Sequence, residues 1–163
     1  MDKKLASQGT PATAILAAAG VPFTLHPYVH DPSAASYGLE AAEVLGIDPG
    51  RVFKTLMVDI EGKLAVGIVP VSGTLDLKAI AAALGSKKAT MADPKMAERR
   101  TGYVLGGISP LGQRQPSPTV LDESALAFGT VLVSGGRRGL DIELDPADLI
   151  RLTGALTALI GSP

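Results

Sequence analysis

The amino-acid sequence predicts an α+β fold in which helices surround a mixed, mostly antiparallel sheet that is curled or barrel-like. Two observations lead to this class: segments with strand character outnumber helical ones, and short turns join most of them. A third observation sets the size, because 163 residues without an internal repeat or a linker-like segment suit a single domain over 1–163.

The amino-acid composition excludes several kinds of catalytic and metal site. An apolar fraction of 46% and a charged fraction of 19% are typical of a globular chain with an ordinary core. The lack of cysteine excludes disulfides, thiolate nucleophiles and cysteine-ligated zinc. His26 and His30 are the only histidines, which excludes an all-histidine metal site. We therefore expect no metal and no cofactor.

The charge distribution limits the partners. A net charge of −1 is too small for strong non-specific binding to nucleic acid. No apolar segment suits a membrane span and the N-terminus lacks an export pattern, so we expect a cytoplasmic protein with no membrane partner. Adjacent basic residues could either meet phosphates or stay solvated. These pairs are Lys87-Lys88, Arg99-Arg100 and Arg137-Arg138.

Capping and turn residues place the elements of the first half. Thr10 before Pro11 is typical of a helix start, and Gly20 of a helix end. Alternating apolar and polar residues then predict a strand, which Pro27 restricts to a sheet edge. The predicted elements are a helix over 11–19, an edge strand over 23–28, a helix over 39–45, and strands over 52–58 and 64–69 joined by Glu61-Gly62.

The same signals continue through the second half. Asp76 begins a helix, and Asp93 and Asp145 are each followed by a proline that favours the first helical turn. A glycine-rich turn over 134–139 separates two strands. The predicted elements are helices over 76–84 and 93–101, strands over 119–122, 130–134 and 140–144, and a last helix from Asp145 with Leu149, Ile150, Leu152, Leu156, Leu159 and Ile160 on its apolar side.

Lys54 conflicts with the pattern of its strand. Side chains alternate at period two, so Lys54 shares a face with the apolar Val52, Leu56 and Val58. A lysine there is costly unless its ammonium reaches a polar pocket or a partner anion, or extends from an edge strand into water. Lys54 is therefore a candidate site residue.

The segment over 101–112 contains glycines where neither a helix nor a regular strand favours them. Gly106-Gly107 followed by Ile108-Ser109-Pro110 could direct two or three backbone N–H groups at one oxygen, which would hold a carbonyl or an oxyanion. The other interpretation is an ordinary turn between two strands.

Common catalytic motifs are absent. The sequence has no Walker-type phosphate loop, no G-x-G-x-x-G after a strand and no G-x-S-x-G. Ser134, Asp141 and either histidine could be written as a triad, but most chains of this size offer such a trio. On residue type alone, Ser134 is a strand-end serine whose hydroxyl caps the following Gly135-Gly136 turn.

Five blocks in one order resemble the YbaK/EbsC-type aminoacyl-tRNA deacylases, relatives of the editing domain of bacterial prolyl-tRNA synthetases. The blocks are Lys54-Thr55-Leu56, Met91-Ala92-Asp93-Pro94, Thr101-Gly102-Tyr103, the residues 106–112 and the residues 133–140. His30-Asp31-Pro32 before Tyr37-Gly38 matches too, although phenylalanine is frequent where Tyr37 stands. The resemblance extends from about Pro22 to the last helix, and implies an enzyme that removes cysteine wrongly attached to the proline tRNA.

The resemblance also implies roles for individual residues. Lys54 would hold the 3′-terminal adenosine or its phosphate. The backbone that would hold the aminoacyl carbonyl comprises Gly106, Gly107 and Ile108. The pocket around the amino acid would comprise Ser134 and Asp141, with Tyr28 and Tyr37 at its mouth.

In this family's chemistry the protein supplies no nucleophile, because the cysteine thiol of the substrate attacks its own ester carbonyl and leaves as a cyclic thiolactone. The implied partners are the 3′ end of an aminoacyl-tRNA and prolyl-tRNA synthetase in a ternary complex. Two alternatives remain open: a deacylase that uses water against another small residue such as alanine, and a non-catalytic module that binds tRNA ends or a synthetase.

Overall fold

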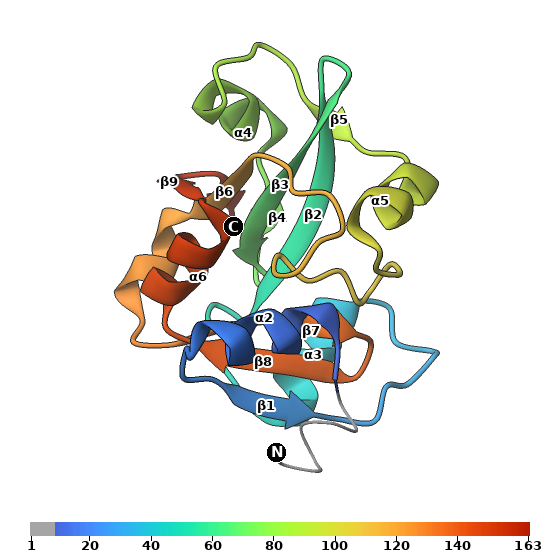
Figure 1. Ribbon diagram of the computed structural model, residues 1–163. Helices are drawn as coiled ribbons and strands as arrows, with labels where there is room; N and C mark the ends of the chain where they lie inside the picture. Colours follow the sequence, from blue (N-terminus) through green and yellow to red (C-terminus); the bar gives the residue numbers. More distant parts are fainter. Residues whose placement is uncertain (1–8) are drawn as a thin grey trace.

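A computed structural model describes residues 9–163 of the chain (Figure 1). The helices are α2 (Pro11–Ala19), α3 (Tyr37–Leu45), α4 (Leu77–Ala83), α5 (Pro94–Thr101) and α6 (Pro146–Thr153), with the 3-10 helix η1 (Glu123–Ala127). The strands are β1 (Thr24–Pro27), β2 (Phe53–Ile60), β3 (Lys63–Pro70), β4 (Thr74–Leu75), β5 (Thr90–Met91), β6 (Thr119–Asp122), β7 (Val131–Arg137), β8 (Leu140–Leu144), β9 (Leu156–Ala158) and β10 (Gly161–Ser162).

The strands form three sheets with the orders β5-β2-β3-β6-β9, β1-β8-β7 and β10-β4. Within these sheets, β3–β6 and β6–β9 pair in parallel and every other pair is antiparallel. The predicted α+β class and the mixed, mostly antiparallel pairing are confirmed. The strands are divided among three sheets rather than one, and a curled or barrel-like closure stays a prediction.

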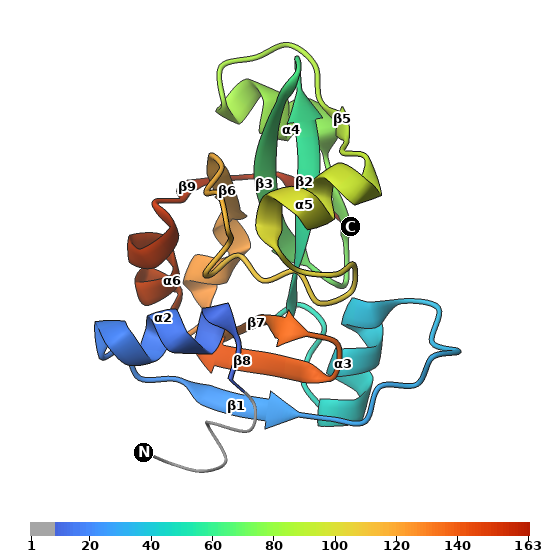
Figure 2. The same ribbon diagram turned by 45° about the vertical axis from the view of Figure 1, so that its right-hand side comes forward.

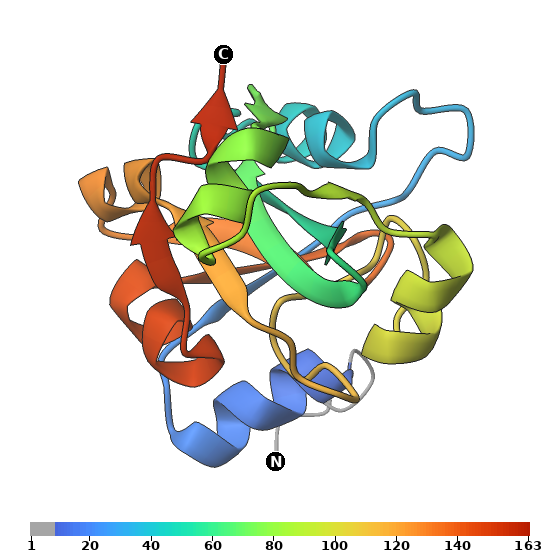
Figure 3. The same ribbon diagram turned by 90° about the horizontal axis from the view of Figure 1, so that it is seen from above.

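The long β2–β3 hairpin rises above the layer formed by β1, β8 and β7 (Figure 2). Seen from above, α2, α5 and α6 lie around the outside of the strands (Figure 3). The largest core cluster joins both layers, because it includes the fully buried Leu16 of α2, Ile68 of β3 and Ile142 of β8. Burial of such side chains away from water is what holds the two layers together.

The two larger sheets meet at the beginning of β2. Val52 forms an isolated parallel bridge with Leu132 of β7, and the Leu132 N–H donates to the Arg51 carbonyl at 3.1 Å. Ala41 and Ala42 of α3 pack against the same two residues in a small apolar cluster. This junction brings the first residues of β2, the helix α3 and the hairpin β7–β8 together.

Two predicted elements in the second half of the chain differ from the structure. The last helix ends at Thr153, because Gly154 takes a left-handed conformation (φ 69°) that stops it. Leu156 therefore lies in β9, and Leu159 and Ile160 lie beyond that strand rather than on the helix. The predicted turn over 134–139 is shorter, because β7 continues through an irregularity in its pairing with β8 to Arg137.

The helix α3 begins at Tyr37, two residues before its predicted start. The Ser36 hydroxyl accepts a hydrogen bond from the Leu39 N–H at 3.3 Å, which caps the first turn. Among the residues 9–163, no helix is both long and apolar enough to cross a membrane. The same part of the chain contains no group of three or more His, Asp or Glu side chains placed to hold a metal ion.

Candidate active site

A pocket of about 360 Å³ lies at the junction of the two larger sheets. Its wall comes from five parts of the chain: the residue after β1, the N-terminal part of α3 with the residues before it, the start of β2, the loop after α5, and the paired strands β7 and β8. The lining residues are Tyr28, Ala35, Ser36, Tyr37, Gly38, Ala41, Val52, Phe53, Lys54, Thr55, Leu56, Leu105, Gly106, Ile108, Ser134 and Asp141.

The structure brings together all but one of the site residues expected from the sequence. Lys54, Gly106, Ile108, Tyr28, Tyr37, Ser134 and Asp141 line the pocket. Gly107 is buried beneath the loop instead, and its N–H donates to the Val104 carbonyl at 2.9 Å. The amide of Gly107 is therefore committed to the loop and is not free to hold a substrate carbonyl.

Lys54 is half-buried, and desolvation lowers the pKa of its ammonium. Within residues 9–163, its side chain has no ion pair and no hydrogen bond. The pocket thus explains why a lysine occurs on the apolar face of β2, since the Lys54 side chain lines this cavity. A cation that is desolvated and unpaired is suited to receive negative charge from a ligand.

The loop over 105–108 approaches the pocket closely because of its two glycines. Gly106 has a φ of 83°, and an added Cβ would lie 2.8 Å from the Tyr37 ring. An added Cβ at Gly107 would lie 2.8 Å from the Arg137 Cα and 3.0 Å from the Arg138 backbone nitrogen. Across the described part of the chain, the N–H groups of Gly106 and Ile108 have no acceptor. These two amides remain available to a bound oxygen.

Asp141 and Ser134 face each other across the β7–β8 ladder. Burial raises the pKa of the Asp141 carboxyl to about 7, and in the residues from 9 onward no ion pair involves it. The Ser134 hydroxyl accepts a hydrogen bond from the Gly136 N–H at 3.2 Å. The predicted hydrogen bond to the following glycines is therefore present, but Gly135-Gly136 belong to an irregularity within β7 and not to a turn. The same serine also lines the pocket.

A pH-dependent stability follows from Asp141. An unfolded aspartate titrates near 4, so between about pH 4 and 7 the native chain binds more protons, and this group lowers stability as pH rises. Asp141→Asn is expected to increase the free energy of unfolding by about 2–4 kcal/mol at pH 8 and to change it little at pH 4. Denaturant unfolding at both pH values measures this difference. An equal effect at the two pH values would contradict it.

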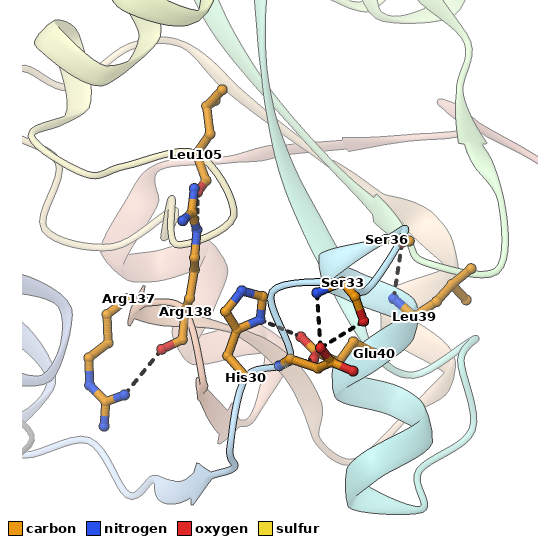
Figure 4. Close-up of polar contacts among 9 residues, drawn as sticks. His30, Ser33, Ser36, Leu39, Glu40, Leu105, Arg137 and Arg138 are labelled. Atoms are coloured by element: carbon orange, nitrogen blue, oxygen red, sulfur yellow. Dashed lines mark hydrogen bonds and ion pairs between the residues drawn. The ribbon is translucent and has the colours of Figure 1, made fainter.

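Polar contacts fix the segments next to the pocket, and Figure 4 shows those of His30, Glu40 and Arg138. The rings of His30 and Tyr37 lie 5.6 Å apart between centroids. His30 Nδ1 and Glu40 Oε1 are 2.8 Å apart, and Glu40 also accepts a hydrogen bond from the Asp31 N–H. Burial, then the nearby carboxylates of Asp141 and Glu40, raise the pKa of Tyr28 to about 12. These contacts hold the segment between β1 and α3 against the pocket.

The structure does not assemble the triad that the sequence allowed. His26 Nε2 lies 2.7 Å from the Glu143 carboxylate, and His30 is bound to Glu40. Within the described residues neither imidazole contacts Ser134 or Asp141 through a hydrogen bond. In residues 9–163 the Ser134 hydroxyl forms no hydrogen bond with a histidine or a carboxylate, so no base activates it as a nucleophile.

Two pocket features were missed from the sequence. Thr55 carries a buried hydroxyl that finds no partner in residues 9–163, although it lines the pocket. Period-two alternation placed it on the face opposite Lys54, and only its position inside the Lys54-Thr55-Leu56 block pointed to it. The first turn of α3 was also missed, because its start was placed two residues late.

Comparisons with known proteins identify the family of the chain. Residues 31–152 match the model of the aminoacyl-tRNA editing domain. A protein of Enterococcus faecalis (strain ATCC 700802 / V583) named "Putative Cys-tRNA(Pro)/Cys-tRNA(Cys) deacylase EbsC" is 38% identical over 98% of each chain. A crystal structure described as "a putative trans-editing enzyme for prolyl tRNA synthetase" is 26% identical, covers 94% of this chain and 96% of that one, and has a TM-score of 0.80. The chain therefore belongs to the aminoacyl-tRNA editing domain family.

Proposed function

We propose that this protein is a trans-editing deacylase that removes cysteine mischarged on the proline tRNA. The family and the name of the Enterococcus relative support deacylation of aminoacyl-tRNA. The observation that carries the proposal is the content of the pocket. Among the described residues, Lys54 is half-buried and unpaired, two backbone amides have no acceptor, and no activated nucleophile lies beside them. Such a site can orient a substrate and stabilise an oxyanion, but it relies on a nucleophile from elsewhere.

The substrate's own thiol fits that requirement. Its sulfur would attack the ester carbonyl, forming a carbon–sulfur bond and an oxyanion. Collapse of the oxyanion would break the bond to the ribose oxygen, which takes the thiol proton and leaves as the free 3′ end. The amino acid leaves as a cyclic thiolactone, which water then hydrolyses. Orientation and oxyanion stabilisation together can contribute on the order of 10 kcal/mol to such a step.

In this proposal, some pocket residues bind the ester carbonyl of the substrate and others bind the amino group and side chain of its amino acid. The amides of Gly106 and Ile108, with the Lys54 ammonium, would receive the carbonyl oxygen as it becomes negative. The Asp141 carboxylate would accept the α-ammonium of the amino acid, which offsets the cost of ionising a buried carboxyl. Ser134 and Thr55 would contact the small side chain, since both line the same pocket.

The thiol mechanism is tested by comparing two nearly isosteric substrates. Cysteinyl-tRNA and 2-aminobutyryl-tRNA, both on the proline tRNA, differ only by the sulfur, so we expect release of cysteine to be at least about 100-fold faster. Rates come from loss of labelled amino acid, and mass spectrometry of the released product distinguishes the thiolactone from free cysteine. Equal rates for the two substrates would reject the thiol mechanism and favour water, with alanyl-tRNA as the next substrate to measure.

The partner synthetase is tested in the same assay. The net charge of −1 gives little electrostatic hold on tRNA, so tRNA identity is proposed to come mostly from prolyl-tRNA synthetase in a ternary complex. Adding the synthetase should speed release from the proline tRNA and leave the cysteine tRNA unaffected. No difference between the two tRNAs with the synthetase present would remove this part of the proposal.

A further inference from the structure

The three basic pairs of the sequence occupy different places in the fold. Arg137-Arg138 lies at the turn between β7 and β8, beside the pocket. Lys87-Lys88 lies in the connection between α4 and β5, at the opposite end of the molecule in Figure 1. Arg99-Arg100 lies at the end of α5 and lines a separate groove with Lys63. Only the first pair borders the site described above.

Arg138 bridges two walls of the pocket mouth. Its Nε donates a hydrogen bond to the Leu105 carbonyl at 2.8 Å, and its guanidinium carbon lies 5.0 Å from the centre of the Tyr37 ring. Leu105 and Tyr37 both line the pocket. The two terminal amino groups of Arg138 have no acceptor within residues 9–163, so they remain available at the mouth (Figure 4).

Arg137 adds a second cation at the same place. Its Nη1 donates to the Arg138 carbonyl at 3.1 Å, which leaves its Nε and Nη2 without a partner in the described chain. Its charge also reaches the pocket, because it opposes the burial that raises the pKa of Tyr28 to about 12. Both arginines are exposed and thus accessible to a macromolecule.

The positive charge at the mouth is not neutralised locally. Neither arginine forms an ion pair in the described residues, and the acceptors that hold them are neutral carbonyls. Carboxylates on the neighbouring segments have other partners, since Glu40 is bound to His30 and Asp31 to Ser33. The Glu98 carboxylate accepts from the Leu105 N–H. Two partly fixed guanidinium groups with free N–H donors match the geometry of phosphate oxygens.

Resting on the proposed function, we propose that Arg137 and Arg138 form a phosphate-binding site at the pocket mouth, and that it holds the sugar–phosphate backbone of the terminal nucleotides of the tRNA. Because the arginines would hold the phosphates at the mouth, the Lys54 ammonium inside the pocket could face the aminoacyl ester. Proteins bind single-stranded nucleic acid mainly through the backbone charge and through bases stacked on aromatic rings. The Tyr37 ring, which lies next to Arg138, is the aromatic side chain proposed for stacking.

Binding of a short oligoribonucleotide ending in CCA tests the site without requiring deacylation. Fluorescence anisotropy over a range of salt concentrations gives both affinity and salt dependence. For Arg137→Gln/Arg138→Gln we expect about 10-fold weaker binding and a log–log salt slope shallower by about 1.4, the value for two phosphates on a single strand. The control Lys87→Gln/Lys88→Gln removes the same charge from exposed positions and should match the wild type. Equal affinity and slope for both double variants would overturn the proposal.

Deacylation kinetics separate phosphate binding from a structural role. The arginine double variant should raise KM for cysteinyl-tRNA about 10-fold with little change in kcat, and leave hydrolysis of 3′-cysteinyl-adenosine, which has no phosphate, unaffected. An equal loss on both substrates would instead show that the arginines only hold Leu105 and Tyr37 in place. If wild type releases no amino acid yet binds the oligoribonucleotide through these arginines, the phosphate site stands and the proposed function fails.

Discussion

Replacing Lys54 with methionine is expected to lower kcat/KM for deacylation by about 10²–10³-fold, the usual cost of losing one group that stabilises an oxyanion. Methionine keeps the length and the apolar stem, so the change removes mainly the charge. The ammonium is half-buried, unpaired in the described residues and of lowered pKa through desolvation. Steady-state release of cysteine from cysteinyl-tRNA measures the effect.

Two controls test whether the loss of activity in Lys54→Met comes from the missing charge at this position. Because a desolvated charge is removed, the melting temperature of Lys54→Met should equal or exceed that of the wild type, which separates loss of function from loss of fold. Lys87→Met removes a charge from an exposed position and should retain full activity. Retention of wild-type kcat/KM by Lys54→Met would remove this lysine from the proposed mechanism.

Gly107→Ala is expected to reduce kcat/KM by about 100-fold and to lower the free energy of unfolding by about 1–3 kcal/mol. The added methyl group would lie 2.8 Å from the Arg137 Cα and 2.9 Å from the Arg137 carbonyl carbon. These are backbone atoms, which cannot rotate away as a side chain can, so the loop itself must shift. The amides of Gly106 and Ile108 would move with it.

The matched control for this substitution is Gly129→Ala. Gly129 is exposed, and an added Cβ there has no atom within 4 Å. It should therefore leave activity unchanged and stability within about 0.5 kcal/mol of the wild type, as surface substitutions usually do. Full activity in Gly107→Ala would show that the close packing of loop and hairpin does not position the proposed carbonyl site.

Local signals in the sequence predicted most of the elements because the signals are chemically specific. Thr10 and Gly20 bound α2 as predicted, and Glu61-Gly62 joins β2 to β3. The misplacement of the last helix has a clear cause, since Leu156, Leu159 and Ile160 continue the helical spacing beyond Gly154. Only Ile160 of these three is buried, whereas Leu156 and Leu159 are exposed, so the apolar spacing did not report burial here.

The candidate site was predictable as a set of residues but not as a geometry. Lys54 was predicted because it places a charge on an apolar strand face. The Gly106-Gly107 pair was predicted because it stands where neither a helix nor a regular strand favours glycine. The commitment of the Gly107 amide to Val104 could not be foreseen, because it depends on the path of the loop. The bulge that continues β7 past Ser134 was also hidden, since glycines favour turns and bulges alike.

Because two sheets meet at the start of β2, the pocket forms only when distant parts of the chain have folded together. The pocket draws on Tyr28 near the beginning of the chain and Asp141 near its end, with Lys54 and the loop at Gly106 between them. Contacts this distant in sequence form only when most of the chain has already been ordered. A cut between Tyr28 and Asp141 followed by loss of either piece therefore removes part of the pocket wall, so deacylation reports molecules that keep this whole span folded.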